Sequence, residues 1–145
     1  MKTGKLEQSE AIAILGRQTL GRLGCIADGE AYVVPVNYFF DGKDIYIHSL
    51  PGKKVEALRI HGRACLQVDE VQNSFEWRSV IAYGDYDEIA DEHLRILTIA
   101  ELFKRLPDMT PVESKMTPEM KESIVFRLRV DKITGVGETW RSISS

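Results

Sequence analysis

The sequence predicts a mainly β protein of the α+β class, a small antiparallel barrel of about six strands, closed or partly open, with flanking helices. Two Asp-Gly pairs, Asp28-Gly29 and Asp41-Gly42, separate runs rich in β-branched and aromatic residues, which is the pattern of a three-stranded meander. Such turns are too short for the crossover connections that parallel strands require. The short connections therefore favour an antiparallel barrel over a doubly wound parallel sheet.

The size and composition of the chain set further limits. With 145 residues, of which 43% are hydrophobic, the chain is expected to form one domain, residues 1–145, with its own core. A formal net charge of −3 without a long basic stripe predicts no nucleic-acid partner. No run reaches the length of a membrane span and no signal-peptide core is present, so a cytoplasmic protein is expected. Cys25 and Cys65 show no CxxC spacing, which predicts buried, reduced thiols.

The first half of the chain begins with a predicted helix at residues 6–20, whose apolar residues recur at helical spacing. Ser9 is the candidate N-cap of this helix, and Gly21 is its candidate stop. The meander follows, with strands expected at residues 23–27, 31–40 and 44–48.

In the second half, helices and strands alternate. Gly84 interrupts the longest β-rich run, which predicts a bulge of the kind that curved sheets contain. Pro107 is expected to end the second long helix, because the residue before a proline disfavours helical geometry. The expected elements are a helix at 53–61, strands at 64–69 and 75–89, a helix at 91–106, a surface loop at 108–118 and a final alternating strand at 124–131.

Residues 44–59, DIYIHSLPGKKVEALR, are the most informative part of the chain. A strand ends there, and a helix is expected to begin at Lys53 and Lys54. A helix start offers unpaired N–H groups and the positive end of the helix dipole, so cations are misplaced there unless an anion binds. Ser49 is a plausible cap or hydroxyl donor. The pattern favours a phosphate-bearing ligand; the alternative is two solvated surface lysines.

Residue types that catalyse reactions do not gather in the sequence. Ser49 follows His48, but neighbours on a strand point to opposite faces and do not form a dyad. The chain has three histidines, at widely separated positions, so we predict no metal site. We therefore expect any chemistry to come from a cofactor.

Two further segments are candidates for ligand contact. Pro35 lies inside a strand, which indicates either an edge strand or a broken strand that exposes its backbone and Asn37 to a planar ligand. Trp77, Arg78 and Ser79 offer a stacking surface, a charge and a hydroxyl together. The alternative is a structural tryptophan with an arginine at the rim of the fold.

Five blocks, taken in order, resemble the pyridoxamine 5′-phosphate oxidase-like superfamily with the FMN-binding split barrel, and within it the branch of the nitroimidazole-resistance reductases. The resemblance covers residues 21–89, and its specificity lies in the order and spacing of the blocks. They are GRLGC, YVVPVNY, DIYIHSLPGKKVEALR, ACLQVDEV and WRSVIAYGDYDEI.

The resemblance implies an FMN site that two chains of a homodimer build at their interface. Lys53 and Lys54 would take the place of the basic pair that holds the FMN phosphate, assisted by Ser49. The other implied cofactor contacts are Val34, Pro35, Val36, Asn37, His48, Arg78, Ser79 and, reaching from the partner chain, Trp140 and Arg141.

The resemblance also implies an FMN-dependent oxidoreductase that passes electrons or hydride from a reduced nicotinamide to a small, unidentified acceptor. It gives no catalytic residue. The oxidase's substrate-binding arginine and histidine motif is not evident, so we do not expect vitamin B6 oxidation. Two alternatives stay open: a haem-binding split barrel with His48 or His61 as axial ligand, and a non-catalytic FMN-binding module.

Overall fold

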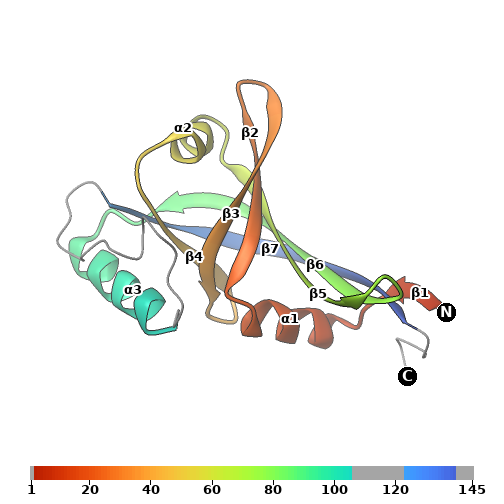
Figure 1. The fold of residues 1–145 in the computed structure, drawn as a ribbon. Coiled ribbons are helices and arrows are strands. Elements are labelled where there is room, and N and C mark those ends of the chain that lie inside the picture. Colours follow the sequence, from red (N-terminus) through yellow and green to blue (C-terminus); the bar gives the residue numbers. More distant parts are fainter. Residues whose placement is uncertain (1, 106–122, 140–145) are drawn as a thin grey trace.

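The computed structural model describes residues 2–105 and 123–139 of the chain. Most of the described chain is strand, and the helices are few (Figure 1). The predicted loop at 108–118 and the residues Trp140 and Arg141 lie outside the described ranges. In chain order the elements are β1 (Lys2–Lys5), α1 (Gln8–Arg17), β2 (Leu20–Ala27), β3 (Glu30–Phe40), β4 (Asp44–Ser49), α2 (Lys53–Ile60), β5 (Arg63–Asn73), β6 (Glu76–Glu88), α3 (Glu92–Arg105) and β7 (Ile124–Thr139).

The strands close into an antiparallel ring. Around the ring the order is β7-β4-β3-β2-β5-β6, and β6 pairs back onto β7. The predicted antiparallel barrel with helices at its sides is therefore confirmed. The short strand β1 was not predicted, and it pairs with β7 outside the ring.

Strand β7 extends well beyond the predicted end at residue 131. Its first half pairs with β4 on one side and β6 on the other, and its second half pairs with β6 and β1. Beyond residue 131, Gly135 and Gly137 interrupt the alternating pattern from which a strand can be predicted. In the structure they allow close packing, because a Cβ at Gly135 would lie 2.9 Å from Leu6 and one at Gly137 would lie 2.9 Å from the Trp77 carbonyl oxygen.

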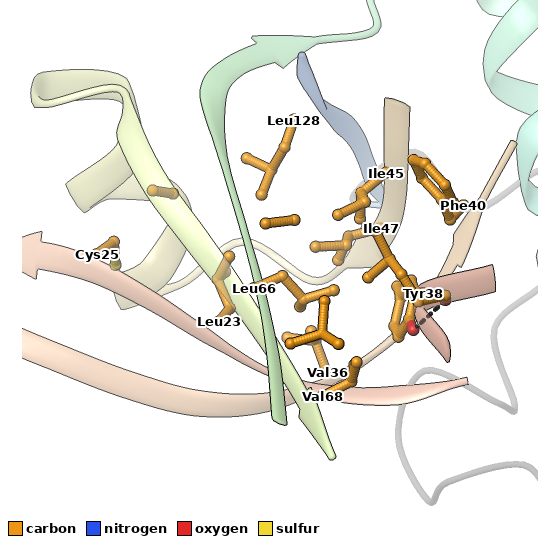
Figure 2. Packing of buried hydrophobic residues seen from close by; sticks show 14 of the residues in the cluster. Leu23, Cys25, Val36, Tyr38, Phe40, Ile45, Ile47, Leu66, Val68 and Leu128 are labelled. Atoms are coloured by element: carbon orange, nitrogen blue, oxygen red, sulfur yellow. Dashed lines mark hydrogen bonds between the residues drawn. The ribbon is translucent and has the colours of Figure 1, made fainter. Parts of the chain in front are cut away.

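The inside of the barrel is filled with aliphatic and aromatic side chains. Figure 2 shows side chains from several strands converging there, among them Val36, Ile47 and Leu66. Alternate residues of each strand supply this core, as the period of two predicts. Tyr38 is fully buried, and its hydroxyl donates a 2.6 Å hydrogen bond to the Leu15 carbonyl oxygen. Burial raises the pKa of Tyr38 well above its usual value, so this hydroxyl keeps its proton and ties α1 to the barrel.

The three described helices occupy different parts of the barrel surface. Helices α1 and α2 lie at opposite ends of the barrel, at the bottom and top of Figure 1. Helix α3 covers the outer face of β4, where Ile99 and Phe103 pack with Tyr46 and Val125. None of the helices within the described ranges has the length and apolar character needed to cross a membrane.

Two expected helix signals of α1 are wrong. Glu7, without a side-chain capping hydrogen bond, is the N-cap, and Ser9 lies inside the helix. The helix ends at Arg17, four residues before Gly21. Gly21 instead lies in β2, where an added Cβ would come within 3.0 Å of the Leu66 side chain. Close approach between strands, and not helix termination, therefore explains the glycine.

The predicted bulge in the long strand is confirmed. The β6–β7 register shifts between Tyr83 and Gly84. A Cβ at Gly84 would lie 2.6 Å from the Arg129 carbonyl oxygen, a contact that only a backbone shift could relieve.

We therefore expect Gly84→Ala to lower the free energy of unfolding by about 1–3 kcal/mol, the usual range for overpacking. Gly16→Ala is the matched control, because it adds the same methyl group within α1 where no atom lies within 4 Å. The control should gain up to about 1 kcal/mol from helix propensity. Urea unfolding followed by circular dichroism measures both; equal stability of the Gly84→Ala variant and the wild type would contradict the tight approach of β6 to β7.

Candidate functional site

The start of α2 has the arrangement that the sequence predicts. Strand β4 ends at Ser49, and α2 begins at Lys53 after the N-cap Gly52, which offers no side-chain capping bond. Val55 and Leu58 of the same helix are buried in the protein. Core packing thus fixes the helix, and its first turn carries two lysines at the positive end of the helix dipole.

Ser49 does not cap this helix. Its side chain is fully buried, and its hydroxyl donates a 2.7 Å hydrogen bond to the Leu50 carbonyl oxygen. Gly52 takes the cap position instead. A role of Ser49 in binding phosphate stays a prediction.

The two lysines carry positive charge that no carboxylate among residues 2–105 and 123–139 neutralises. Neither Lys53 nor Lys54 forms an ion pair with any carboxylate in the part of the chain that the structure describes. Lys53 is exposed, and its Nζ lies 4.9 Å from the centre of the Tyr32 ring. Lys54 is half-buried. Their charges are therefore available to an anion.

Lys53 contacts Tyr32 on β3, and Lys54 lies near Cys25 on the neighbouring strand β2. Burial raises the pKa of the Cys25 thiol, the neighbouring Cys65 adds to the rise, and the charge of Lys54 opposes it. Cys25 and Tyr32 are direct partners across the β2–β3 ladder. Both contribute to the barrel core or pack against it. The lysine pair therefore lies over one cross-strand pair on the inner face of the β2–β3 hairpin.

Two arginines near α2 and α3 are paired with carboxylates, unlike the two lysines as far as the described residues show. A hollow of about 740 Å³ between α2 and α3, with both polar and apolar side chains in its lining, is bordered by Arg59 and Arg95. Arg59 pairs with Glu88 at 2.9 Å, and Arg95 pairs with Glu92 at 2.8 Å. Because carboxylates already balance these cations, the lysine pair is the stronger candidate for binding an anion.

The four cofactor contacts predicted on β3 alternate between the face toward the barrel core and the outward face. Strand β3 continues through Pro35 without a break, and its residues 30–37 pair with β2 only, as far as the described ranges show. This matches the edge-strand interpretation of the proline. Val36 is buried and Val34 packs against the same core, whereas Pro35 is exposed and Asn37 is half-buried. Side chains that could meet an external ligand are therefore Pro35 and Asn37.

His48 lies under α3. Its side chain is buried, and its ring meets the Phe103 ring edge-on, with the centroids 5.8 Å apart. Ile47 points into the barrel core, so His48 faces outward and Ser49 inward, as the alternation predicts. A cofactor contact of His48 stays a prediction.

Arg78 and Ser79 lie far from the lysine pair within one chain. The Arg78 guanidinium donates to Glu10 of α1 at 2.6 Å, and the Ser79 hydroxyl accepts from Gln67 at 3.0 Å. Helices α1 and α2 mark opposite ends of the barrel (Figure 1). One protomer therefore does not bring Arg78 and Lys53 to the same place.

An apolar hollow of about 370 Å³ is lined in part by Cys25 and Tyr32, the cross-strand pair near the lysines. Sequence reasoning missed it, although the two-residue turn at Asp28-Gly29 sets the hairpin register and so pairs Tyr32 with Cys25. The hollow places an apolar surface beside Tyr32, whose ring Lys53 contacts. Within the described residues, no group of His, Cys, Asp or Glu side chains could hold a metal ion. The hollow is lined by Gly24, Cys25, Ile26, Ala31, Tyr32, Val33, His61, Arg63, Ala64, Cys65 and Tyr83.

Comparison with known proteins gives matches over most of the chain. A family model described as pyridoxamine 5′-phosphate oxidase matches residues 7–136. An uncharacterized protein of Rhizobium meliloti is 28% identical over 138 residues, which cover 90% of this chain and 91% of that protein. Among solved structures, an FAD-binding protein of Mesorhizobium loti is similar with a TM-score of 0.77 at 29% identity, covering 96% of this chain and 100% of that one.

A further solved structure shows the same fold at lower identity. It is a protein of Bacteroides thetaiotaomicron described as a 5-nitroimidazole antibiotic resistance protein, with a TM-score of 0.75 and 22% identity. The match covers 94% of this chain and 87% of that one.

The position of Lys54 gives a prediction for the protein without ligand. Because a cation is unfavourable in the first turn of a helix, we expect Lys54→Gln to raise the free energy of unfolding by about 0.3–1 kcal/mol at low ionic strength. Lys104→Gln is the control, because Lys104 lies in the last turn of α3, where the same change should lower stability. Urea unfolding with and without inorganic phosphate, at constant ionic strength, measures both. A loss of stability in the Lys54 variant would show that no local conflict exists.

Proposed function

Because the chain belongs to the pyridoxamine 5′-phosphate oxidase family, we propose that it is an FMN-binding flavoprotein, with the FMN phosphate held by Lys53 and Lys54. The observation that carries this proposal is the lysine pair at the start of α2, whose charge no described carboxylate balances. A helix start with two cations is suited to a terminal phosphate. The FAD-binding protein of Mesorhizobium loti, at 29% identity, supports flavin as the ligand class.

Two of the proposed cofactor contacts on β3 are open to an external ligand. Pro35 and Asn37 lie on the outward face of β3, beside a backbone edge that has no described strand partner. When bound, FMN would supply the hydride or electron transfer that the side chains of this protein do not offer. The chain's own residues would bind the phosphate, orient the ring and shield one face of it from water. The role of an oxidoreductase that uses a reduced nicotinamide and a small acceptor is part of this proposal, and no catalytic residue is assigned.

The alternative of a haem site depends on His48 or His61. His48 is buried against Phe103, and His61 is exposed at the end of α2. His48 lies under α3 and His61 lines the apolar hollow at the end of α2, so a haem at either place would have one of them as its single histidine ligand. A lysine pair at a helix start also suits a phosphate better than the spread carboxylates of a porphyrin.

The proposed site is completed by a second copy of the chain. Arg78 and the lysine pair lie at opposite ends of one protomer, so they could meet one cofactor only if different protomers supply them. Strands β2, β3, β5 and β7 also leave large apolar side chains exposed, as a protein interface requires. They are Leu20, Ile26, Val33, Val71 and Val136.

The flavin proposal predicts that Lys53→Ala combined with Lys54→Ala weakens FMN binding by about 2–4 kcal/mol, since each charged contact contributes about 1.5–3 kcal/mol before a discount for exposure. Quenching of FMN fluorescence on titration with the protein measures the dissociation constant. The double variant Lys43→Ala and Lys104→Ala removes the same charge elsewhere and should bind as the wild type does. Equal affinity of both double variants would remove the lysine pair from the site.

The same titration separates the cofactor classes. FAD and haem are titrated in parallel; tighter FAD binding would correct FMN to FAD, and a Soret band with no flavin quenching would favour haem. Adding NADPH to the FMN complex without oxygen then tests the oxidoreductase. Bleaching of the flavin absorbance is expected, and an unchanged spectrum with every nicotinamide and acceptor tried would favour a non-catalytic FMN-binding module.

The dimer proposal predicts that Val71→Asp lowers the mass measured by light scattering from that of two chains to that of one. The charge would be buried without a partner in the interface, while Val71 is 63% exposed in the single chain. Leu97→Asp is the control, because Leu97 is also an exposed apolar residue, at 53%, but lies on α3. A wild-type protein that stays monomeric at micromolar concentrations would contradict the proposal.

A further inference from the structure

The Lys53 side chain rests on an aromatic ring that the barrel core fixes in place. Its Nζ lies 4.9 Å from the centre of the Tyr32 ring. Tyr32 is half-buried and packs against the main hydrophobic cluster. Its direct partner across the β2–β3 ladder, Cys25, is itself buried in that cluster. The ring is therefore a rigid support for an otherwise exposed, flexible side chain.

An aromatic ring beside a lysine leaves the charge and the N–H donors of the ammonium group available to a ligand, whereas a carboxylate does not. A carboxylate would neutralise the ammonium and occupy its N–H donors, as Glu88 and Glu92 do for Arg59 and Arg95. A ring face attracts the cation through its quadrupole but takes away neither the net charge nor most of the three donors. Lys53 can thus be held in position and still bind a phosphate oxygen.

The contact also joins two parts of the fold that are linked by little else. Residues 30–37 of β3 have β2 as their single strand neighbour within the described ranges. Helix α2 packs against β2, and the lysine–tyrosine contact adds a link from α2 to β3. The contact therefore fixes the position of residues 30–37 of β3 relative to the first turn of α2.

We propose that Tyr32 is a positioning residue for the anion site: its ring holds the Lys53 ammonium at the start of α2 before the ligand arrives. This inference rests on the proposed binding of the FMN phosphate by Lys53. Holding the side chain in advance reduces the rotamer entropy that binding would otherwise remove. Tyr32 itself need not touch the ligand, so its effect should pass entirely through Lys53 and concern only the phosphate.

The test compares Tyr32→Leu with Tyr32→Phe, which keeps the ring, using FMN and its phosphate-free analogue riboflavin. We expect Tyr32→Leu to weaken FMN binding about two- to fivefold, the equivalent of an exposed cation–π contact, with riboflavin affinity unchanged. Tyr32→Phe should bind both as the wild type does. In a Lys53→Ala background, Tyr32→Leu should have no further effect on FMN affinity.

Three outcomes would overturn the inference: equal weakening of FMN and riboflavin, the same loss in the Lys53→Ala background, or no loss in Tyr32→Leu. Wild-type protein that binds no FMN would instead overturn the proposed function on which the inference depends, so the two failures are distinct. A second measurement needs no flavin. In the free protein, the ring current of Tyr32 should shift the Lys53 ε-methylene protons upfield in NMR spectra, a shift kept in Tyr32→Phe and lost in Tyr32→Leu. Its absence from the wild type would show that the contact does not form.

Discussion

The pairing of β7 with both β4 and β6 is the constraint on which the rest of the structure depends, because it closes the barrel. Closure requires very close backbone approach, which glycine permits at Gly84 on β6 and at Gly137 on β7. Once the ring is closed, each strand has a fixed inner and outer face, and a shift of one residue would exchange them. The position of every candidate ligand contact on β3 and β4 follows from this register.

The helix that carries the lysine pair is held by that closed core and not by its own sequence signals. Gly52 offers no side chain to cap α2, and cations occupy the first turn, where the helix dipole disfavours them. Val55 and Leu58 compensate, since both are buried in the protein. Tertiary packing of an amphipathic face commonly stabilises short helices in this way. A helix start that is unfavourable by itself can therefore be kept where an anion site requires it.

Local patterns were enough to predict most of the fold. Alternation and the Asp-Gly turns located β2 to β4, and Gly84 marked the bulge, because each of these signals arises from neighbouring residues. The errors concern residues whose role is set by distant partners: Gly21 meets Leu66 of β5, and β1 forms only by pairing with β7. In the site, the lysine pair was visible in the sequence because it breaks a local rule. The ion pair of Arg78 with Glu10 spans 68 positions, and no local pattern predicts it.

The distribution of charge partners separates structural cations from those available to a ligand. The arginines around α2 and α3 are paired with carboxylates, which fixes them in the fold but leaves little net field for an anion. Lys53 has an aromatic neighbour in the same part of the protein, and so keeps its charge. An exposed lysine without any support would keep its charge too, but it would sample many rotamers and be ordered only on binding. The Tyr32 ring restricts the rotamers of Lys53 and leaves its charge in place. The β2–β3 register, which pairs Tyr32 with Cys25, positions this ring beside Lys53.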